Sequence, residues 1–295
     1  MTVKIENDNF LVEISSKGAE IQKFIKKDTN KNVIWRGDEK IWKNHAPILF
    51  PFVARCLGGY FLIEGKKCEY SKNHGFARDL EHKLLSQSKE EAIFELTQSD
   101  ETLYRFPYKF SLITEYNLTK NGLDWKITVK NTDSKKFSFG AGTHAAFDLC
   151  GNKAEDFCVE FQKKEVLTSV VCTPEGYIAI DANNKIITKP YGEKEKGIIP
   201  ITKEGFGNGH LFTNFSSEWV ALRNLKTNEV TKISTKGFPY CMIWQNTSGD
   251  AQFVCIEPWQ GIPDVENTNH IWEEKPGQLI LKPGEEFSMV QDITV

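Results

Sequence analysis

Residues 110–130 read FSLITEYNLTKNGLDWKITVK and carry the clearest structural pattern in the chain. Apolar side chains alternate with polar ones on both sides of Asn121-Gly122, which is the period of a strand with one buried face. Asn-Gly favours a two-residue type I′ turn, because both central residues must take positive φ. We therefore predict a hairpin in which Leu118 lies opposite Trp125 and both apolar sets share one sheet face.

The same period of two recurs in short segments along most of the chain. Alternating or half-apolar runs of strand length, with turn residues between them, occur at 10–14, 60–63, 92–96, 278–281 and 287–293. No amphipathic helical pattern extends beyond about three turns, and no linker or internal repeat divides the chain. These features predict an all-β fold, a large antiparallel β-sandwich with few short helices, formed by residues 1–295 as a single domain.

Composition and charge exclude several classes of protein. Lys and Arg number 37 against 40 Asp and Glu, giving a net charge of −3, so nucleic-acid binding through bulk charge is not expected. The longest apolar run, at 46–54, is about half the length that spans a bilayer, and the N-terminus does not resemble a signal peptide. The 7 cysteines are scattered, without a C-x-x-C spacing, which indicates free thiols in a reducing cytoplasm rather than disulfides or a zinc site. We predict a cytoplasmic protein with no membrane partner, metal or cofactor.

Three segments place titratable side chains among small residues, at 73–79, 140–148 and 255–261. Each has an ordinary structural explanation, since an isolated histidine is usually a hydrogen-bonded structural group and a glutamate that ends a strand usually points to water. Spacing alone supports only an acid–base site that uses some histidine and some glutamate.

Taken together, these segments resemble the aldose 1-epimerase (galactose mutarotase) family, in particular its bacterial LacX-like branch. The resemblance covers nearly the whole chain and is carried by five blocks in family order: APILFP at 46–51 with Arg55, HGFARD at 74–79, GTHAAF at 142–147, IEPW at 256–259 and LKPGE at 281–285. HGFAR and IEPW in this order are specific, whereas the closing LKPGE is weak alone. The resemblance implies a galactose mutarotase-like β-sandwich.

The resemblance also implies roles for five residues. Glu257 would remove the proton of the anomeric hydroxyl while His144 protonates the ring oxygen, so that the sugar ring opens and recloses as the other anomer. Arg55, His74 and Arg78 would bind the sugar. The implied activity is that of an isomerase, an aldose 1-epimerase acting on a hexose without metal or cofactor, as a monomer or homodimer.

Two questions of substrate stay open within this family. A related branch acts on hexose 6-phosphates, and Lys72, Arg78 and Arg55 lie near the site segments. The family also uses an aspartate that holds sugar hydroxyls. This chain shows no clear equivalent near 209–214, where His210 and Asn214 are the candidates.

Two alternative functions outside the isomerases also remain as hypotheses. A glycoside hydrolase needs two facing carboxylates about 5–9.5 Å apart, and the candidate partners for Glu257 are Asp79, Asp148 and Asp264. A non-catalytic sugar-binding protein would keep Arg55, His74 and aromatic platforms such as Phe212 or Trp244, but would need no acid–base pair. The presence of both His144 and Glu257 favours an enzyme.

Overall fold

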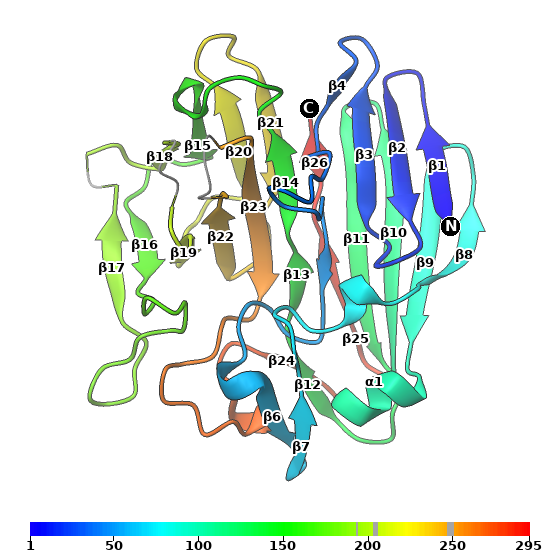
Figure 1. Ribbon diagram of the computed structural model, residues 1–295, viewed down its shortest axis with the longest axis vertical. Helices are drawn as coiled ribbons and strands as arrows, with labels where there is room; N and C mark the ends of the chain where they lie inside the picture. Colours follow the sequence, from blue (N-terminus) through cyan, green and yellow to red (C-terminus); the bar gives the residue numbers. More distant parts are fainter. Residues whose placement is uncertain (193, 203–205, 247–250) are drawn as a thin grey trace.

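The computed structural model describes residues 1–192, 194–202, 206–246 and 251–295, and two large antiparallel sheets dominate it (Figure 1). This confirms the predicted all-β class. Within the described residues the larger sheet runs β18 (Ile198–Pro200), β15 (Phe157–Phe161), β20 (Trp219–Asn224), β21 (Val230–Ser234), β26 (Ile293–Thr294), β11 (Gly122–Asn131), β10 (Phe110–Thr119), β9 (Glu91–Thr97) and β8 (Lys83–Gln87), with β25 (Glu286–Val290) also paired to β11.

The second large sheet carries the strands that matter most for function. Its order is β17 (Thr188–Tyr191), β16 (Leu167–Val170), β19 (His210–Thr213), β22 (Tyr240–Trp244), β23 (Phe253–Gln260), β13 (Ala141–Thr143) and β5 (Ile48–Leu49), with β14 (Ala145–Asp148) also paired to β23.

Smaller elements complete the described part of the chain. A further sheet joins β1 (Thr2–Glu6), β2 (Phe10–Ser15), β3 (Ile21–Lys26) and β4 (Lys31–Asn32), and two-stranded sheets join β12 (Phe137–Phe139) to β24 (Leu279–Leu281) and β6 (Tyr60–Ile63) to β7 (Lys66–Glu69). The helices are short, as predicted: α1 (Asp100–Arg105) and the 3₁₀ turns η1 (Leu57–Gly59), η2 (Ala77–Asp79), η3 (Ala154–Asp156) and η4 (Trp272–Glu274).

The predicted hairpin forms between β10 and β11, but its register differs by two residues. Leu118 pairs with Leu123, so the prediction that it lies opposite Trp125 was wrong. The turn precedes Gly122, which already belongs to β11. A Cβ at Gly122 would lie 1.8 Å from the carbonyl oxygen of Ile293. A glycine is therefore needed at this position because β26 approaches it closely, and not because of the turn geometry. Because a shift of two residues preserves the face, both apolar sets still point into the core.

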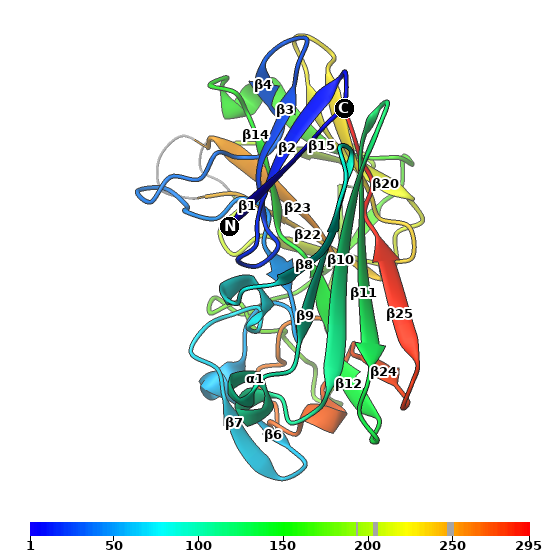
Figure 2. The ribbon, with the colours of Figure 1, turned by 90° about the vertical axis from the view of Figure 1, so that its right-hand side faces the viewer.

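The main core lies between the two large sheets, which form separate layers in the view of Figure 2. Strand β23 is buried on both faces. Val254 and Ile256 point into the main core, whereas Cys255 packs on the opposite face. Since side chains alternate along a strand, Glu257 shares that opposite face with Cys255, outside the space between the sheets.

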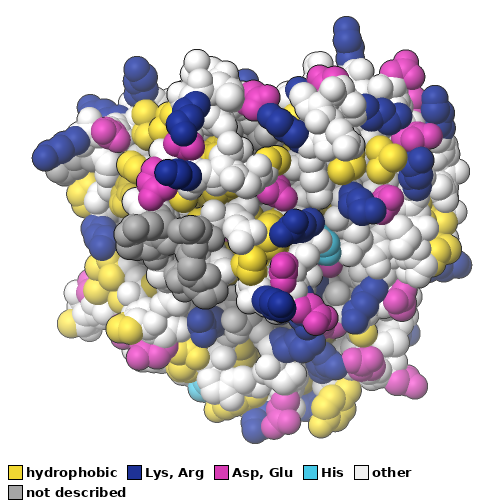
Figure 3. Space-filling model, turned by 45° about the horizontal axis from the view of Figure 1, so that its top comes forward, with side chains coloured by type: hydrophobic (Ala, Val, Ile, Leu, Met, Phe, Trp, Pro, Cys, Tyr) yellow, Lys and Arg dark blue, Asp and Glu magenta, His cyan; other side chains and the backbone are white. Residues whose placement is uncertain are grey.

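Charges are distributed over the surface without one dominant sign. Lys and Arg side chains are interspersed with Asp and Glu on the face drawn in Figure 3, in agreement with the net charge of −3. None of the described helices is long and apolar enough to cross a membrane.

Candidate active site

A cavity of about 480 Å³ opens over the outer face of β23. All five residues singled out from the sequence line it: Arg55, His74, Arg78, His144 and Glu257. They come from four separate parts of the chain, and the fold brings them around one space.

Strand pairing sets the closest contact in this cavity. Strands β13 and β14 both pair with β23 in one common register, which places His144, between them, opposite Glu257. The His144 Nε2 atom lies 3.4 Å from Glu257 Oε2. The two residues are 8% and 0% exposed, so the pair is shielded from bulk water.

Burial governs the protonation of this pair. It raises the pKa of the Glu257 carboxyl well above its ordinary value. It also lowers the pKa of His144 to about 3, and the nearby Arg78 guanidinium adds to that shift. Neither carboxylate oxygen of Glu257, nor Nδ1 of His144, has a partner in hydrogen-bonding geometry among the described residues. Without substrate, burial therefore favours the uncharged state of the pair, a protonated Glu257 carboxyl and a neutral His144.

Tryptophan side chains fix the imidazole of His144. Trp42 stacks on it with ring centroids 5.0 Å apart and an interplanar angle of 29°, and Trp244 meets it edge-on at 5.7 Å. The backbone N–H of His144 donates to the Pro47 carbonyl at 2.9 Å. Trp42, Trp244 and Trp259 all line the cavity, and such apolar rings suit the C–H faces of a sugar.

His74 is held in a tautomer that can donate into the cavity. The backbone N–H of Ala54 donates to Nδ1 of His74 at 2.9 Å, and the backbone N–H of His74 donates to the Ala54 carbonyl at 2.9 Å. Burial first, then the neighbouring charges, lowers the pKa of His74 well below its ordinary value. A neutral ring that accepts at Nδ1 carries its proton on Nε2. The following glycine, Gly75, is required, because a Cβ there would lie 2.1 Å from the Phe50 carbonyl oxygen.

A buried ion pair positions the backbone of Arg55. The Asp264 N–H donates to the Arg55 carbonyl at 3.1 Å, and its Oδ2 accepts from the Leu57 N–H at 2.8 Å. The other oxygen of Asp264 accepts from Lys275 Nζ at 2.6 Å. The Arg55 side chain is exposed at the rim, where Gly176 leaves room for it, since a Cβ there would lie 2.8 Å from Arg55 Nε.

The short turn η2 presents Arg78 to the cavity. Burial lowers the pKa of this half-buried guanidinium, and no carboxylate of the described chain lies within ion-pair distance of it. The adjacent Asp79 instead pairs with Lys72 at 3.0 Å. Behind the turn, His82 hydrogen-bonds through Nε2 to the Ala77 carbonyl at 3.0 Å.

His82 makes stability depend on pH. Burial lowers its pKa from 6.5 to about 4, so between these values the unfolded chain binds the proton more readily than the folded one. The contribution of neutral His82 is therefore present above pH 6.5 and is lost as the pH falls toward 4. We expect wild type to lose roughly 2 kcal/mol more unfolding free energy between pH 7 and 5 than His82→Gln, measured by urea denaturation. Equal losses in both proteins would contradict this role.

The candidates for the family's sugar-binding aspartate were misplaced. His210 and Asn214 do not line the cavity: His210 packs against Tyr191 with ring centroids 5.0 Å apart, and Asn214 occupies a positive-φ turn position. Asn44 and Asn208 line the cavity instead. Sequence reasoning missed both, because they lie on irregular segments without a periodic pattern or motif.

A second carboxylate is missing from the described lining of the cavity, where Glu257 is the one acidic side chain. Of the three candidate partners, Asp79 pairs with Lys72 and Asp264 is engaged with Lys275. Asp148 lies on a different cavity. The described site therefore lacks the facing carboxylates of a glycoside hydrolase.

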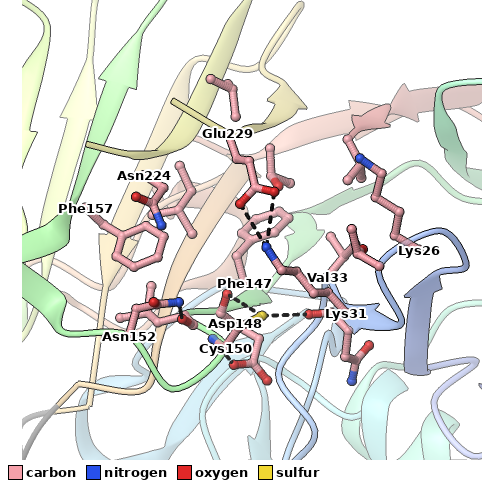
Figure 4. Close-up of a pocket in the computed structure, with 17 residues that line it drawn as sticks. Lys26, Lys31, Val33, Phe147, Asp148, Cys150, Asn152, Phe157, Asn224 and Glu229 are labelled. Atoms are coloured by element: carbon pink, nitrogen blue, oxygen red, sulfur yellow. Dashed lines mark hydrogen bonds and ion pairs between the residues drawn. The ribbon is translucent and has the colours of Figure 1, made fainter. Parts of the chain in front are cut away.

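That other cavity, of about 180 Å³, lies beyond the Asp148 end of β14 (Figure 4). Apolar and amide side chains make up most of its described lining, and no histidine is among them. At its edge Lys31 Nζ lies 2.9 Å from a Glu229 oxygen, and the thiol of Cys150 lies 3.6 Å from the Asn32 carbonyl oxygen. It offers no imidazole–carboxyl pair, so the larger cavity is the candidate active site.

Comparison with known proteins agrees with this geometry. The family model described as aldose 1-epimerase matches residues 1–294. The chain belongs to the aldose 1-epimerase family. This aldose 1-epimerase homologue is 24% identical over 304 residues to the chromosomal protein LacX of Lactococcus lactis subsp. lactis, covering 100% of this chain and 99% of the relative.

Solved structures show the same fold. A galactose mutarotase related enzyme from Lactobacillus acidophilus superposes with a TM-score of 0.92 at 30% identity, over 100% of this chain and 97% of that one. A galactose mutarotase-like protein from Lactobacillus casei ATCC 334 gives 0.91 at 28% identity, over 100% and 99%. Membership of the aldose 1-epimerase family points to an isomerase of the mutarotase type.

Proposed function

We propose that this protein, as a single domain, interconverts the α and β anomers of an aldose, with His144 and Glu257 as its acid–base pair. The observation that carries the proposal is the 3.4 Å approach of His144 Nε2 to Glu257 Oε2 at the wall of one cavity. Family membership and the cationic and aromatic lining support a sugar as the ligand.

The reaction follows from moving the one proton that the pair holds. In the reactive form Glu257 is a carboxylate and His144 an imidazolium. Glu257 takes the proton of the anomeric hydroxyl, His144 gives its proton to the ring oxygen O5, the C1–O5 bond breaks and C1=O1 forms. Rotation about C1–C2 and the reverse transfers close the ring as the other anomer.

Burial of the pair favours the opening step. The two transfers convert an ion pair into neutral Glu257 and neutral His144, which is the charge state that a desolvated site prefers. The cost lies in forming the ionic pair before reaction, and hydrogen-bond donors around the sugar offset part of it. His74 Nε2–H and the Arg55 guanidinium are the donors that we assign to sugar oxygens.

We expect Arg55→Ala to raise KM by about 10–100-fold with a smaller change in kcat, because a hydrogen bond from a charged donor contributes about 1.5–3 kcal/mol. His74→Ala should act in the same direction. The matched control is Arg36→Ala, since Arg36 lies over Trp35 with its guanidinium carbon 5.5 Å from the ring and does not line the cavity. Initial rates by polarimetry give both constants, and an unchanged KM in both site variants would contradict their binding role.

A phosphorylated aldose is the second candidate substrate. Three cationic side chains, Arg55, Lys72 and Arg78, line the cavity against one carboxyl group in its described lining. Lys72 already pairs with Asp79, which leaves the two arginines for a phosphate. The test compares kcat/KM for glucose and galactose with that for their 6-phosphates. If kcat/KM is more than about tenfold higher for a 6-phosphate, and Arg78→Ala removes this preference, the substrate is a phosphorylated aldose. Equal kcat/KM values for the free and phosphorylated sugars assign the free aldose.

A further inference from the structure

A buried thiol lies beside the proposed acid–base pair. Cys255 precedes Glu257 by two residues on β23, so the two side chains point to the same face. The ligand atoms of His144, Cys255 and Glu257 all lie within 4.8 Å of one another. Cys255 does not line the cavity and is fully buried.

We propose that His144, Cys255 and Glu257 form a binding site for a thiophilic divalent cation such as Zn²⁺, and that the bound ion reversibly inhibits the enzyme. Imidazole nitrogen, thiolate sulfur and carboxylate oxygen are the ligand types that Zn²⁺ selects. The fourth tetrahedral position would face the cavity, where water or a sugar hydroxyl can fill it.

The distances suit such an ion. Zinc–ligand bonds of about 2.0–2.2 Å to nitrogen and oxygen place two tetrahedral ligand atoms roughly 3.3 Å apart, and His144 Nε2 lies 3.4 Å from Glu257 Oε2. A zinc-bound Cys255 sulfur would lie about 3.5–3.7 Å from each of these atoms, and the three ligand atoms already lie within 4.8 Å of one another.

Unpartnered atoms supply an independent reason. Both carboxylate oxygens of Glu257, which is 0% exposed, lack a partner in hydrogen-bonding geometry among the described residues. Buried polar atoms normally have partners, and a cation would satisfy the carboxylate directly. Mg²⁺ and Ca²⁺ prefer six or more oxygen ligands, so this set discriminates against them.

The inhibition follows from which atoms the ion occupies. Binding displaces the Cys255 thiol proton and the carboxyl proton of Glu257. His144 and Glu257 then cannot accept or donate during ring opening. A chelator restores them, because the ion forms no covalent adduct. The inhibition rests on the proposed function, whereas the binding does not.

The experiment separates binding from activity. All proteins carry Cys150→Ala, because Cys150 is the exposed thiol. Co²⁺ serves as the optical probe, since thiolate ligation gives a near-ultraviolet charge-transfer band, and Zn²⁺ serves as the inhibitor. Cys255→Ala is the test variant. Cys241→Ala is the matched control, because Cys241 is equally buried on the neighbouring strand β22 but packs into the main core. Thermal melts verify that both variants fold.

We expect Co²⁺ to give the band in the parent and in Cys241→Ala but not in Cys255→Ala. Zn²⁺ should inhibit anomer exchange in the first two, reversibly with EDTA, and at least tenfold more weakly in Cys255→Ala, whose activity without metal stays near that of the parent. A band that persists in folded Cys255→Ala, or that never forms, would overturn the site. If the band behaves as expected but no protein accelerates anomer exchange, the metal site stands and the proposed function fails.

Discussion

Glu257→Gln lowers the catalysed rate of anomer exchange by about 10²–10⁴-fold, as does His144→Asn, while both variants fold as wild type does. This range corresponds to roughly 3–5.5 kcal/mol of barrier, the usual contribution of a general acid or base. Gln keeps the shape of Glu257 but cannot accept the hydroxyl proton, and Asn cannot serve as a reversible proton donor. Exchange-NMR rates at saturating sugar, with the spontaneous rate subtracted, give the change in kcat.

A matched substitution shows that the loss belongs to the site. Glu160→Gln makes the same chemical change outside the cavity, at the partly exposed position of β15 where Glu160 pairs with Arg223 at 2.6 Å, and should alter the rate less than twofold. Either site variant turning over near the wild-type rate would remove that residue from its assigned role.

Lys275→Met destabilises the protein by about 3–5 kcal/mol and also raises KM. Lys275 and Asp264 are nearly inaccessible, with side chains 3% and 1% exposed, so removing the ammonium leaves a buried carboxylate without its counter-ion. Because Asp264 holds the carbonyl of Arg55 and the N–H of Leu57, its displacement should disturb sugar capture as well. Denaturant titration measures the first effect and steady-state kinetics the second.

Two comparisons keep this prediction specific. Lys226→Met removes an ion pair of similar length, 2.7 Å to Asp156, but Lys226 is 68% exposed, so its cost should stay below about 1 kcal/mol. The double variant Asp264→Asn/Lys275→Met no longer buries an unpaired charge and should recover at least half of the loss. Equal destabilisation by Lys275→Met and Lys226→Met would show that the buried pair has no special weight.

Local patterns predicted the fold class but not how strands meet. Alternation in residues 110–130 gave the correct buried face, yet the register was wrong because Gly122 was assigned to the turn. A glycine is needed at position 122 because the backbone of Ile293 lies against it. Ile293 is distant in sequence, so the local pattern around residue 122 could not predict this contact. The short helices followed from the absence of helical periodicity and were predicted correctly.

Only the site residues that lie within recognisable sequence motifs could be predicted. Residue types and spacing suggested a histidine and a glutamate, and the family resemblance selected His144 and Glu257. The two residues face each other because β13 and β14 pair with β23. This pairing joins segments that are distant in sequence, so it could not be predicted from local sequence patterns. Asn44 and Asn208 lie on irregular segments and were missed, and Trp42, also unforeseen, stacks on His144. The spacing of Cys255 and Glu257 does place both on one strand face. It indicates a metal site only once the structure shows His144 beside them.

Exchange NMR on a panel of free and phosphorylated aldoses tests the central claim most directly. For at least one aldose, wild type should transfer magnetisation between the α and β anomeric protons at a rate proportional to enzyme concentration and well above that in buffer, and Glu257→Gln should abolish most of this acceleration. Saturable sugar binding without acceleration for any member of the panel would contradict the account and leave a sugar-binding protein in its place.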